Sequence, residues 1–232
     1  MKAIITAAGR GSRLGALTRY IPKGLLPVNG ESMIARQIRI LGLYGITDVA
    51  IITGYQSEKI IEQFKNRVTF FHNPDYRTTT STASLCKAIN FMDTDVIVMT
   101  SDTVFPEKSL EALLKNENRY CLLIDHKRCD MEAVKVEVAD NMIEKAGKNL
   151  SVDNAFGEWT YISRIKECGL ADYKEILQEC AVNKLGQSQI FVGLIHKGHA
   201  VHYELMNGEW TEVDFVKDYR EAKRIFEFEM KV

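Results

Sequence analysis

The stretch that decides the fold lies near the start of the chain and reads Ala7-Ala8-Gly9-Arg10-Gly11-Ser12-Arg13-Leu14-Gly15. It follows directly on a short apolar run at residues 2–6, which predicts a buried strand. Glycine lets backbone N–H groups turn inward and approach an anion closely, so a glycine-rich loop after a strand is suited to phosphate oxygens. We therefore expect a phosphate-binding loop at the end of the first strand.

Two common phosphate-loop patterns do not fit this stretch. A P-loop requires Gly-Lys-Ser/Thr at its far end, whereas Gly15 is followed by Ala16. A dinucleotide fingerprint requires Gly-x-Gly-x-x-Gly, but Leu14 stands where the third glycine belongs, which counts against a dehydrogenase. A plain flexible turn is the remaining alternative, and it accounts poorly for the two cations, Arg13 and Lys23, placed ten residues apart near one loop.

Outward from the loop, the chain alternates between two patterns. Residues 48–54 and 95–100 are β-branched apolar runs, typical of strands buried on both faces. Residues 32–44, 57–64 and 81–92 carry the spacing or capping residues of helices. Alternation of strand and helix predicts right-handed crossovers that build a mainly parallel sheet.

After about residue 120 the pattern changes, and we expect the strands and helices to mix. Strands are predicted at residues 120–124, 133–138, 159–162 and 201–205, and helices at 171–182, 188–197 and 215–230. The predicted fold class is α/β: a Rossmann-like, mainly parallel sheet with flanking helices, plus a small mixed α+β subdomain. We expect a single domain over residues 1–232, with a nucleotide-binding part at 1–120, an acceptor-binding part at 121–214 and a C-terminal helix at 215–232.

Composition limits the classes of protein that this chain can represent. The 232 residues include 30 Lys and Arg against 31 Asp and Glu, which argues against a surface built to bind nucleic acid. The first apolar run is too short for a signal peptide or a membrane span, so we expect a cytoplasmic protein without membrane insertion. The five cysteines form no Cys-x-x-Cys pair and predict neither a zinc site nor a disulfide framework. The oligomeric state, a homo-oligomer included, stays open.

The glycine-rich loop continues into a second motif, Pro22-Lys23-Gly24-Leu25-Leu26-Pro27-Val28. Together the two motifs resemble the signature of the nucleoside-triphosphate transferases that activate sugar phosphates and phospho-alcohols, although Gly24 stands where that family more often has alanine. The resemblance implies that the loop wraps the triphosphate and that Lys23 and Arg13 are catalytic. Their charges would offset the repulsion between two anionic substrates. The implied nucleotide-binding residues of the loop are Ala7, Ala8, Gly9, Gly11, Ser12 and Arg13.

Two aspartates stand where the family holds Mg²⁺. Asp102 follows the apolar run at residues 95–100, and Asp214 precedes the last predicted helix. Magnesium favours a few carboxylates together with substrate phosphates, so we expect Mg²⁺ as the cofactor with these two ligands. Glu212, two residues before Asp214, is a weaker candidate for support. The alternatives are a turn role for Asp102 and a helix-capping role for Asp214.

Further blocks resemble the cytidylyltransferase branch, represented by the bacterial phosphocholine, aminoethylphosphonate and inositol-phosphate cytidylyltransferases. Gly54, Tyr55 and Ser84 match loosely the positions that approach base and ribose, although residues 79–82 are Thr-Thr-Ser-Thr where that branch usually carries asparagine. The candidate acceptor-binding residues are Lys135, Glu158, Trp159 and Trp210.

The acceptor itself is not fixed by these blocks. Trp159 and Trp210, with Tyr161 and Tyr203, could cage a quaternary ammonium, but aromatic residues in strands are more often core. Relatives that handle amino-alcohols tend to carry an acidic residue before the helix at 188–197, where this chain has Gln187. The sequence therefore favours a neutral or zwitterionic acceptor.

Our prediction is a Mg²⁺-dependent cytidylyltransferase that joins CTP to a small phosphorylated or phosphonate metabolite, phosphocholine-like or aminoethylphosphonate-like, and releases pyrophosphate. The first alternative is a sugar-1-phosphate nucleotidyltransferase that uses UTP, dTTP or GTP. The alternative from another class is a non-catalytic nucleotide-binding module, against which the presence of Lys23, Asp102 and Asp214 speaks.

Overall fold

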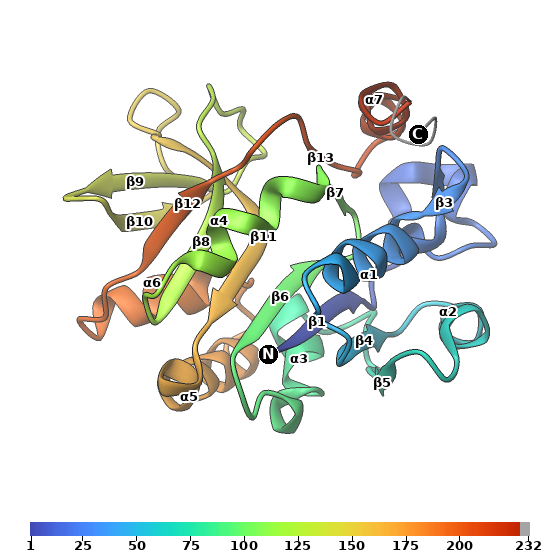
Figure 1. The fold of residues 1–232 in the computed structure, drawn as a ribbon, viewed down its shortest axis with the longest axis horizontal. Helices are drawn as coiled ribbons and strands as arrows, with labels where there is room; N and C mark the ends of the chain where they lie inside the picture. Colours follow the sequence, from blue (N-terminus) through green and yellow to red (C-terminus); the bar gives the residue numbers. More distant parts are fainter. Residues whose placement is uncertain (228–232) are drawn as a thin grey trace.

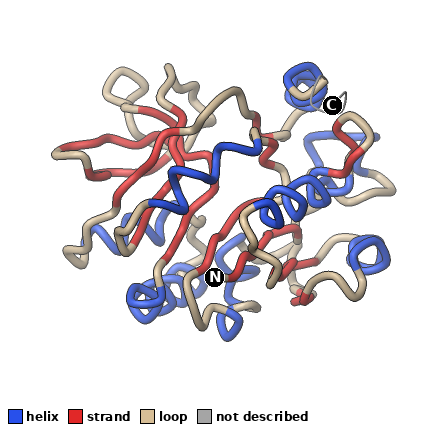
Figure 2. Tube along the Cα trace, in the orientation of Figure 1, coloured by secondary structure: helices blue, strands red, loops and turns tan. Residues whose placement is uncertain are grey.

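The structure of the protein, a computed structural model, describes residues 1–227. Within those residues nine strands form one sheet, in which β10-β9-β11-β6-β1-β4-β5 lie side by side and β8 and β12 continue from β11 (Figures 1 and 2). Helices pack on both faces of this sheet. The arrangement confirms the predicted α/β class, with the qualification that the half beyond residue 120 brings antiparallel pairs into the sheet.

The N-terminal half of the sheet is parallel, as the alternation of strand and helix predicts. β1 pairs with β4 and β6, and β4 pairs with β5. The strands are β1 (Lys2–Ala7), β4 (Val49–Thr53), β5 (Thr69–His72) and β6 (Val96–Thr100). β4 is buried along its whole length, which explains its unbroken apolar run. Because β1, β4 and β6 run in the same direction, the loops that follow them meet at one edge of the sheet.

The helices cover the two faces in separate groups. One face packs against α1 (Met33–Leu43), α2 (Ser57–Phe64) and α4 (Leu110–Lys115), and the other against α3 (Ser81–Cys86), α5 (Leu170–Val182) and α6 (Ser188–His196). The expected helix over residues 81–92 is shorter in the structure, since α3 ends at Cys86 and a 3₁₀ turn, η3 (Ile89–Phe91), follows. The side chain of Ser32 caps α1 by accepting a hydrogen bond from the Ala35 amide at 3.3 Å.

The second half of the chain builds the mixed part of the sheet. Its strands are β8 (Tyr120–Asp125), β9 (Lys135–Ala139), β10 (Met142–Gly147), β11 (Gly157–Ile165) and β12 (His202–Leu205). β11 runs antiparallel to β6, β8 and β9. β10 was not expected from the sequence; it follows β9 through a two-residue turn, Asp140 and Asn141, whose positive φ values of 49° and 59° match a type I′ hairpin.

Short elements complete the fold around the loops. They are η1 (Ser12–Thr18), η2 (Lys23–Leu25), η4 (Glu107–Ser109), η5 (Glu167–Gly169), β2 (Pro27–Val28), β3 (Glu31–Ser32), β7 (Thr103–Val104), β13 (Thr211–Glu212) and α7 (Val216–Ile225). The predicted C-terminal helix at 215–230 corresponds to α7, and residues 228–232 lie outside the described part of the chain. Among the described residues, no helix has both the length and the apolar character needed to cross a membrane.

Candidate active site

The glycine-rich loop leaves β1 and folds back through a left-handed turn at Gly11, where φ is 64°. A Cβ at Gly11 would also lie 3.0 Å from the Lys23 side chain, so this position requires glycine for two reasons. The Thr18 hydroxyl donates to the Gly11 carbonyl at 2.9 Å and closes the loop. From the turn after β4, the Tyr55 hydroxyl donates to the Arg19 carbonyl at 2.7 Å, which ties the far end of the loop to the sheet.

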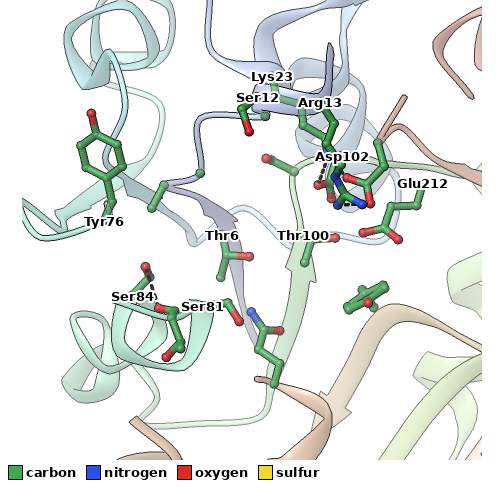
Figure 3. A pocket seen from close by; sticks show the side chains of 18 of the residues that line it. Thr6, Ser12, Arg13, Lys23, Tyr76, Ser81, Ser84, Thr100, Asp102 and Glu212 are labelled. Atoms are coloured by element: carbon green, nitrogen blue, oxygen red, sulfur yellow. Dashed lines mark hydrogen bonds and ion pairs between the residues drawn. The ribbon is translucent and has the colours of Figure 1, made fainter. Parts of the chain in front are cut away.

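A cavity of about 390 Å³, here called the main cavity, opens where β1 and β6 end (Figure 3). Thr6 and Thr100 are paired in register at the ends of these two strands, and both line its floor. Figure 3 shows the charged side chains at one end of the cavity and Tyr76 at the other, with Ser81 and Ser84 presented by α3. The full lining is Thr6, Ala8, Gly9, Gly11, Ser12, Arg13, Lys23, Tyr76, Thr79, Thr80, Ser81, Ser84, Thr100, Ser101, Asp102, Tyr161, Gln187, Glu212 and Asp214.

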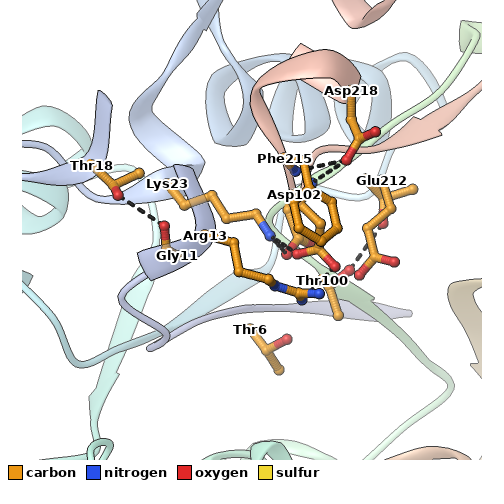
Figure 4. Close-up of polar contacts among 12 residues, drawn as sticks. Thr6, Gly11, Arg13, Thr18, Lys23, Thr100, Asp102, Glu212, Phe215 and Asp218 are labelled. Carbon is orange, nitrogen blue, oxygen red and sulfur yellow. Dashed lines mark hydrogen bonds and ion pairs between the residues drawn. The ribbon is translucent and has the colours of Figure 1, made fainter. Parts of the chain in front are cut away.

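The charged end is an ion-pair network centred on Lys23 (Figure 4). The Lys23 Nζ lies 2.6 Å from Asp102 Oδ2 and 2.6 Å from Asp214 Oδ1. An Arg13 guanidinium nitrogen lies 2.6 Å from the other oxygen of Asp214. Asp102 and Asp214 meet because β7 pairs with β13 and the Val213 amide donates to the Asp102 carbonyl at 2.9 Å.

The charges of this cluster set the protonation of its members. Burial alone would lower the pKa of Lys23, but Asp102 and Asp214 outweigh it and the pKa is raised. For Asp102, burial acts to raise the pKa, yet the Lys23 ammonium dominates and the pKa is lowered. Burial, followed by the neighbouring charges of Asp102 and Asp214, raises the pKa of Glu212 to about 8. Asp102 and Asp214 are thus paired with basic side chains, and Glu212 lies beside them.

The acidic side chains fit a magnesium ion. Asp102, Glu212 and Asp214 each offer a carboxylate oxygen, and these oxygens lie within 4.8 Å of one another. Oδ1 of Asp102 is buried and has no hydrogen-bond partner within residues 1–227. A small hard cation prefers such a set of oxygens together with substrate phosphates. The donor set is therefore consistent with Mg²⁺.

The start of α7 fixes the direction of Asp214. The Asp218 carboxylate accepts hydrogen bonds from the Phe215 amide at 2.7 Å and from the Asp214 amide at 3.1 Å (Figure 4). These bonds satisfy amides at the helix start that have no partner inside the helix. Asp218 is therefore a positioning residue for Asp214.

At the opposite end, the segment that follows β5 shapes the wall of the main cavity. The Asn73 side-chain amide donates to the Ser84 hydroxyl at 2.9 Å and to the Thr79 hydroxyl at 3.0 Å. Asn73 is fully buried, so it fixes both hydroxyls from behind. The cavity is lined here by neutral donors and acceptors, which suits the edge of a base or a ribose.

Tyr161 reaches the main cavity because β11 is distorted at that point. The register of β11 against β8 shifts between Trp159 and Ser163, and Tyr161 has a φ of 59°. A positive φ is unusual for a bulky residue, and a bulge re-aims the side chain of a strand. Burial, and then the charge of Glu212, raises the pKa of the Tyr161 phenol, which stays neutral.

A family profile described as the MobA-like NTP transferase domain matches residues 3–136, which is more than half of the chain. The chain belongs to this family. The resemblance to nucleoside-triphosphate transferases seen in the two motifs is therefore confirmed. The matched residues contain the glycine-rich loop, Lys23 and Asp102, whereas Asp214 lies outside them.

Relatives of this MobA-like chain extend over most of its length. It is 25% identical over 232 residues to the bifunctional protein GlmU of Methanococcus maripaludis, covering 97% of this chain and 54% of that protein. The chain thus spans about half the length of that relative. It is 23% identical over 254 residues to the CTP:phosphoglutamine cytidylyltransferase of Campylobacter jejuni, with 94% and 97% of the two chains covered.

Solved structures show the same fold. The inositol-1-phosphate CTP transferase from T. maritima superposes with a TM-score of 0.82 at 20% identity, covering 98% of this chain and 96% of that one. The CTP:phosphocholine cytidylyltransferase from Streptococcus pneumoniae superposes with a TM-score of 0.74 at 26% identity, covering 97% and 98%.

The structure brings most of the sequence-predicted residues of this NTP transferase to one place. Those that line the main cavity are Ala8, Gly9, Gly11, Ser12, Arg13, Lys23, Ser84, Asp102 and Asp214. Ala7 is buried in β1, and Gly54 and Tyr55 support the loop from behind. At Gly54 a Cβ would lie 2.6 Å from the Ala8 carbonyl oxygen, so glycine permits that close packing. The catalytic, nucleotide-binding and metal roles of these residues stay predictions.

The predicted acceptor residues separate into two groups. Glu158 and Trp210 line a smaller cavity of about 160 Å³, here called the acidic cavity, which shares Glu212 and Asp214 with the main cavity. Its further lining residues are Lys127, Asp130, Glu132, Ala133, Thr211, Phe215, Lys217 and Asp218.

Lys135 and Trp159 lie elsewhere. The Trp159 indole N–H donates to the Ile162 carbonyl at 3.1 Å, and its side chain is in the core. The Lys135 ammonium is enclosed and donates to the Ala133 carbonyl at 3.2 Å, where it fixes the preceding loop. Neither side chain lines the main cavity or the acidic cavity, and their acceptor-binding role stays a prediction.

Sequence reasoning missed several lining residues. Tyr76, Thr79 and Thr80 lie in the segment after β5, whose sequence matches base- and ribose-approaching positions only loosely and does not single out these side chains. The sequence suggested Tyr161 only as one member of an aromatic cage. No local sequence signal predicts the distortion of β11 that directs Tyr161 into the main cavity. Glu212, a weaker candidate in the sequence, lies within the acidic cluster itself.

Proposed function

We propose that this protein is a Mg²⁺-dependent cytidylyltransferase, which joins CTP to a small phosphorylated or phosphonate metabolite and releases pyrophosphate. The observation that carries the proposal is the network of Lys23, Asp102 and Asp214 at the end of a cavity that begins at a glycine-rich loop. The preference for CTP is supported by the relatives, whose names specify CTP for phosphoglutamine, inositol 1-phosphate and phosphocholine.

The chain's own residues can perform the transfer in an arrangement that offsets charge. An oxygen of the acceptor's phosphate attacks the α-phosphorus, a new O–P bond forms, and the bond to the bridging oxygen breaks as pyrophosphate leaves with the electron pair. In this proposal Lys23 stabilises charge on the α-phosphate, and Arg13, which lines the same cavity, holds the β- and γ-phosphates together with amides of the loop. Asp102, Glu212 and Asp214 would hold Mg²⁺. When bound, the metal supplies Lewis-acid charge that orients and neutralises the phosphates.

In this proposed reaction, much of the rate enhancement comes from positioning the two substrates. Two anionic substrates repel each other, so holding them in line removes a large part of the barrier. The Tyr55 and Thr18 hydrogen bonds keep the loop closed, and Asn73 fixes the hydroxyls near the expected base. Because the donors at that end are neutral, we expect the protein to discriminate between bases by hydrogen bonding and not by charge.

A pyrophosphate-release matrix tests the proposal. Four nucleoside triphosphates, CTP, UTP, GTP and dTTP, are paired with phosphocholine, phosphoethanolamine, aminoethylphosphonate, inositol 1-phosphate, glycerol phosphate and hexose 1-phosphates. We expect release with CTP and at least one of the non-hexose acceptors, loss of release on chelation of magnesium, and loss in Asp214→Asn. Faster release with UTP, dTTP or GTP and a hexose 1-phosphate would favour the sugar branch, and no release with any pair would indicate a non-catalytic nucleotide-binding module.

A further inference from the structure

A third cavity of about 420 Å³, here called the side cavity, adjoins the main cavity. The two share three residues: Ser81 at the start of α3, Tyr161 on β11 and Gln187 just before α6. The rest of its wall comes from the residues around Lys148 after β10 and from the start of α6. These three side chains therefore form the boundary between the two cavities, which is here called the passage.

Gln187 is the unusual member of this passage. It is only 5% exposed, and its Nε2 is buried without a hydrogen-bond partner among the described residues. A buried amide nitrogen that donates to nothing costs stability, so its retention calls for a partner that the protein alone does not provide. Because Gln187 lines both cavities, a bound molecule in the passage can accept that hydrogen bond.

The passage also contains strained backbone. Tyr161 adopts a φ of 59° within β11, and its ring packs against Trp159 with centroids 4.9 Å apart. Strain of this kind persists only where the surroundings enforce it, and it is found preferentially at ligand sites. It places the phenol ring between the two cavities, opposite α3 and the start of α6.

The charges of the side cavity decide which chemistry fits. Among residues 1–227, Lys148 is the only formally charged side chain that lines it, and it lies 3.7 Å from Glu132. No carboxylate of these described residues lines the side cavity. A quaternary or primary ammonium would therefore meet Lys148 and no counter-charge among these lining residues, which is unfavourable. Hydroxyl or carboxamide groups, in contrast, can pair with the amide of Gln187 and the hydroxyl of Ser81.

The acidic cavity could in principle receive an ammonium, but the chain already supplies one. The Lys127 Nζ lies 3.0 Å from Asp125 Oδ2, 3.2 Å from Glu158 Oε2 and 4.8 Å from the centre of the Trp210 ring. The Trp210 indole N–H donates to the same Asp125 oxygen at 2.8 Å. Lys127 therefore already occupies the aromatic face of Trp210 and pairs with Glu158, the carboxylate of the acidic cavity beside it.

We propose that the part of the acceptor beyond its phosphate enters the side cavity between Ser81, Tyr161 and Gln187, and that it carries uncharged hydroxyl or carboxamide groups in place of an ammonium. Gln187 is then the residue that selects the acceptor, by donating a hydrogen bond to it. This inference rests on the proposed function, because it names the class of acceptor for that reaction.

Three variants and two acceptors test the inference. The ratio of kcat/KM for phosphocholine to that for inositol 1-phosphate is measured in the wild type, Gln187→Glu, Lys127→Met and the matched surface control Gln178→Glu on the exposed side of α5. We expect the wild type to prefer inositol 1-phosphate and Gln187→Glu to raise the ratio at least about tenfold, because the new carboxylate supplies a counter-charge for the quaternary ammonium and removes the amide that donates to a hydroxyl. Lys127→Met and Gln178→Glu should leave the ratio within about twofold.

A fourth variant separates binding from folding. Gln187→Leu removes the unpartnered amide, so it should unfold at the same temperature as the wild type or higher, while KM for inositol 1-phosphate rises about fivefold or more and kcat changes little. A residue with a purely structural role would lose stability and leave KM unchanged. That outcome would overturn the assignment of Gln187.

Calorimetric titration of the same two acceptors, with magnesium and a non-hydrolysable CTP analogue, measures acceptor binding separately from the transfer reaction. Turnover in which Lys127→Met alters the selectivity and Gln187→Glu does not would place the acceptor in the acidic cavity and overturn the inference. Absence of turnover with every pair, combined with the expected change of binding selectivity in Gln187→Glu, would overturn the proposed reaction and support the acceptor site.

Discussion

Replacement of Lys23 by methionine is the most direct test of the charged network, because it removes the ammonium and keeps most of the apolar stem. The Lys23 side chain is 9% exposed and pairs at 2.6 Å with both Asp102 and Asp214. After the change, Asp214 still has Arg13 at 2.6 Å, whereas Asp102 loses the basic partner that lowers its pKa. We therefore expect the loss of stability to arise mainly from the unpaired carboxylate of Asp102.

The size of the expected loss in stability follows from the burial of this ion pair. Removing one partner of a buried ion pair costs about 3–5 kcal/mol, and since Asp102 and Asp214 keep 18% and 20% of their side-chain surface exposed, we expect about 3 kcal/mol in the magnesium-free protein. Turnover should fall about 10²–10³-fold, the usual cost of losing one preorganised contact to developing charge. Magnesium should restore part of the lost stability, because the ion supplies the missing positive charge among the carboxylates.

The assays are urea denaturation with and without magnesium and pyrophosphate release at saturating substrate. Lys115→Met is the control, since Lys115 is 75% exposed and pairs only with Glu111 on the surface; it should change stability by less than about 0.5 kcal/mol. Near-normal turnover in Lys23→Met would remove Lys23 from the mechanism. A loss of stability that magnesium does not reduce would contradict the assignment of the carboxylates to a metal.

Three further predictions follow from local geometry. Gly24→Ala should lower the free energy of unfolding by about 1–3 kcal/mol, because a Cβ there would lie 2.6 Å from Ile34 Cδ1. Adding Ile34→Val removes that atom, so the double variant should recover part of the lost stability in urea denaturation. Strictly additive losses from the two substitutions would refute the explanation. Asp218→Ala should cost about 1 kcal/mol and weaken magnesium binding in calorimetric titration, because the Asp218 carboxylate holds the Asp214 amide at 3.1 Å; an unchanged magnesium affinity would show that Asp214 is positioned by other contacts. In the native protein a colorimetric thiol assay should find one fast-reacting cysteine, Cys168, since the other cysteines are buried or half-buried; a second equivalent in the fast phase would contradict the described packing.

Much of the N-terminal half could be predicted because its elements are defined by local sequence. A strand buried on both faces is an unbroken apolar run, and β1, β4 and β6 all fall within the expected ranges to within one or two residues. The helix over residues 81–92 was less accurate, since α3 ends at Cys86. The hairpin of β9 and β10 was missed although Asp140 and Asn141 form the type of turn that favours it.

The acceptor side was predicted less well, for a reason that applies to any single sequence. Aromatic and basic residues in strands have the same appearance whether they line a site or fill a core. Trp159 and Lys135 proved to be enclosed, and the Lys127 ammonium, which the sequence did not single out, occupies the place against Trp210. Which face a strand residue takes depends on register and on bulges, which neighbouring strands impose.

The sequence by itself determined the glycine-rich loop, the position of Lys23 just beyond it and the aspartate after β6, because spacing along the chain and the end of a buried strand are local properties. Only the tertiary structure decided that Lys23 meets Asp214, 191 residues away, and that Tyr161 and Gln187 stand between two cavities. The first contact depends on the pairing of β13 with β7, and the passage depends on a bulge in β11. Long-range strand pairing and the side-chain directions that it enforces arise from packing of the whole chain.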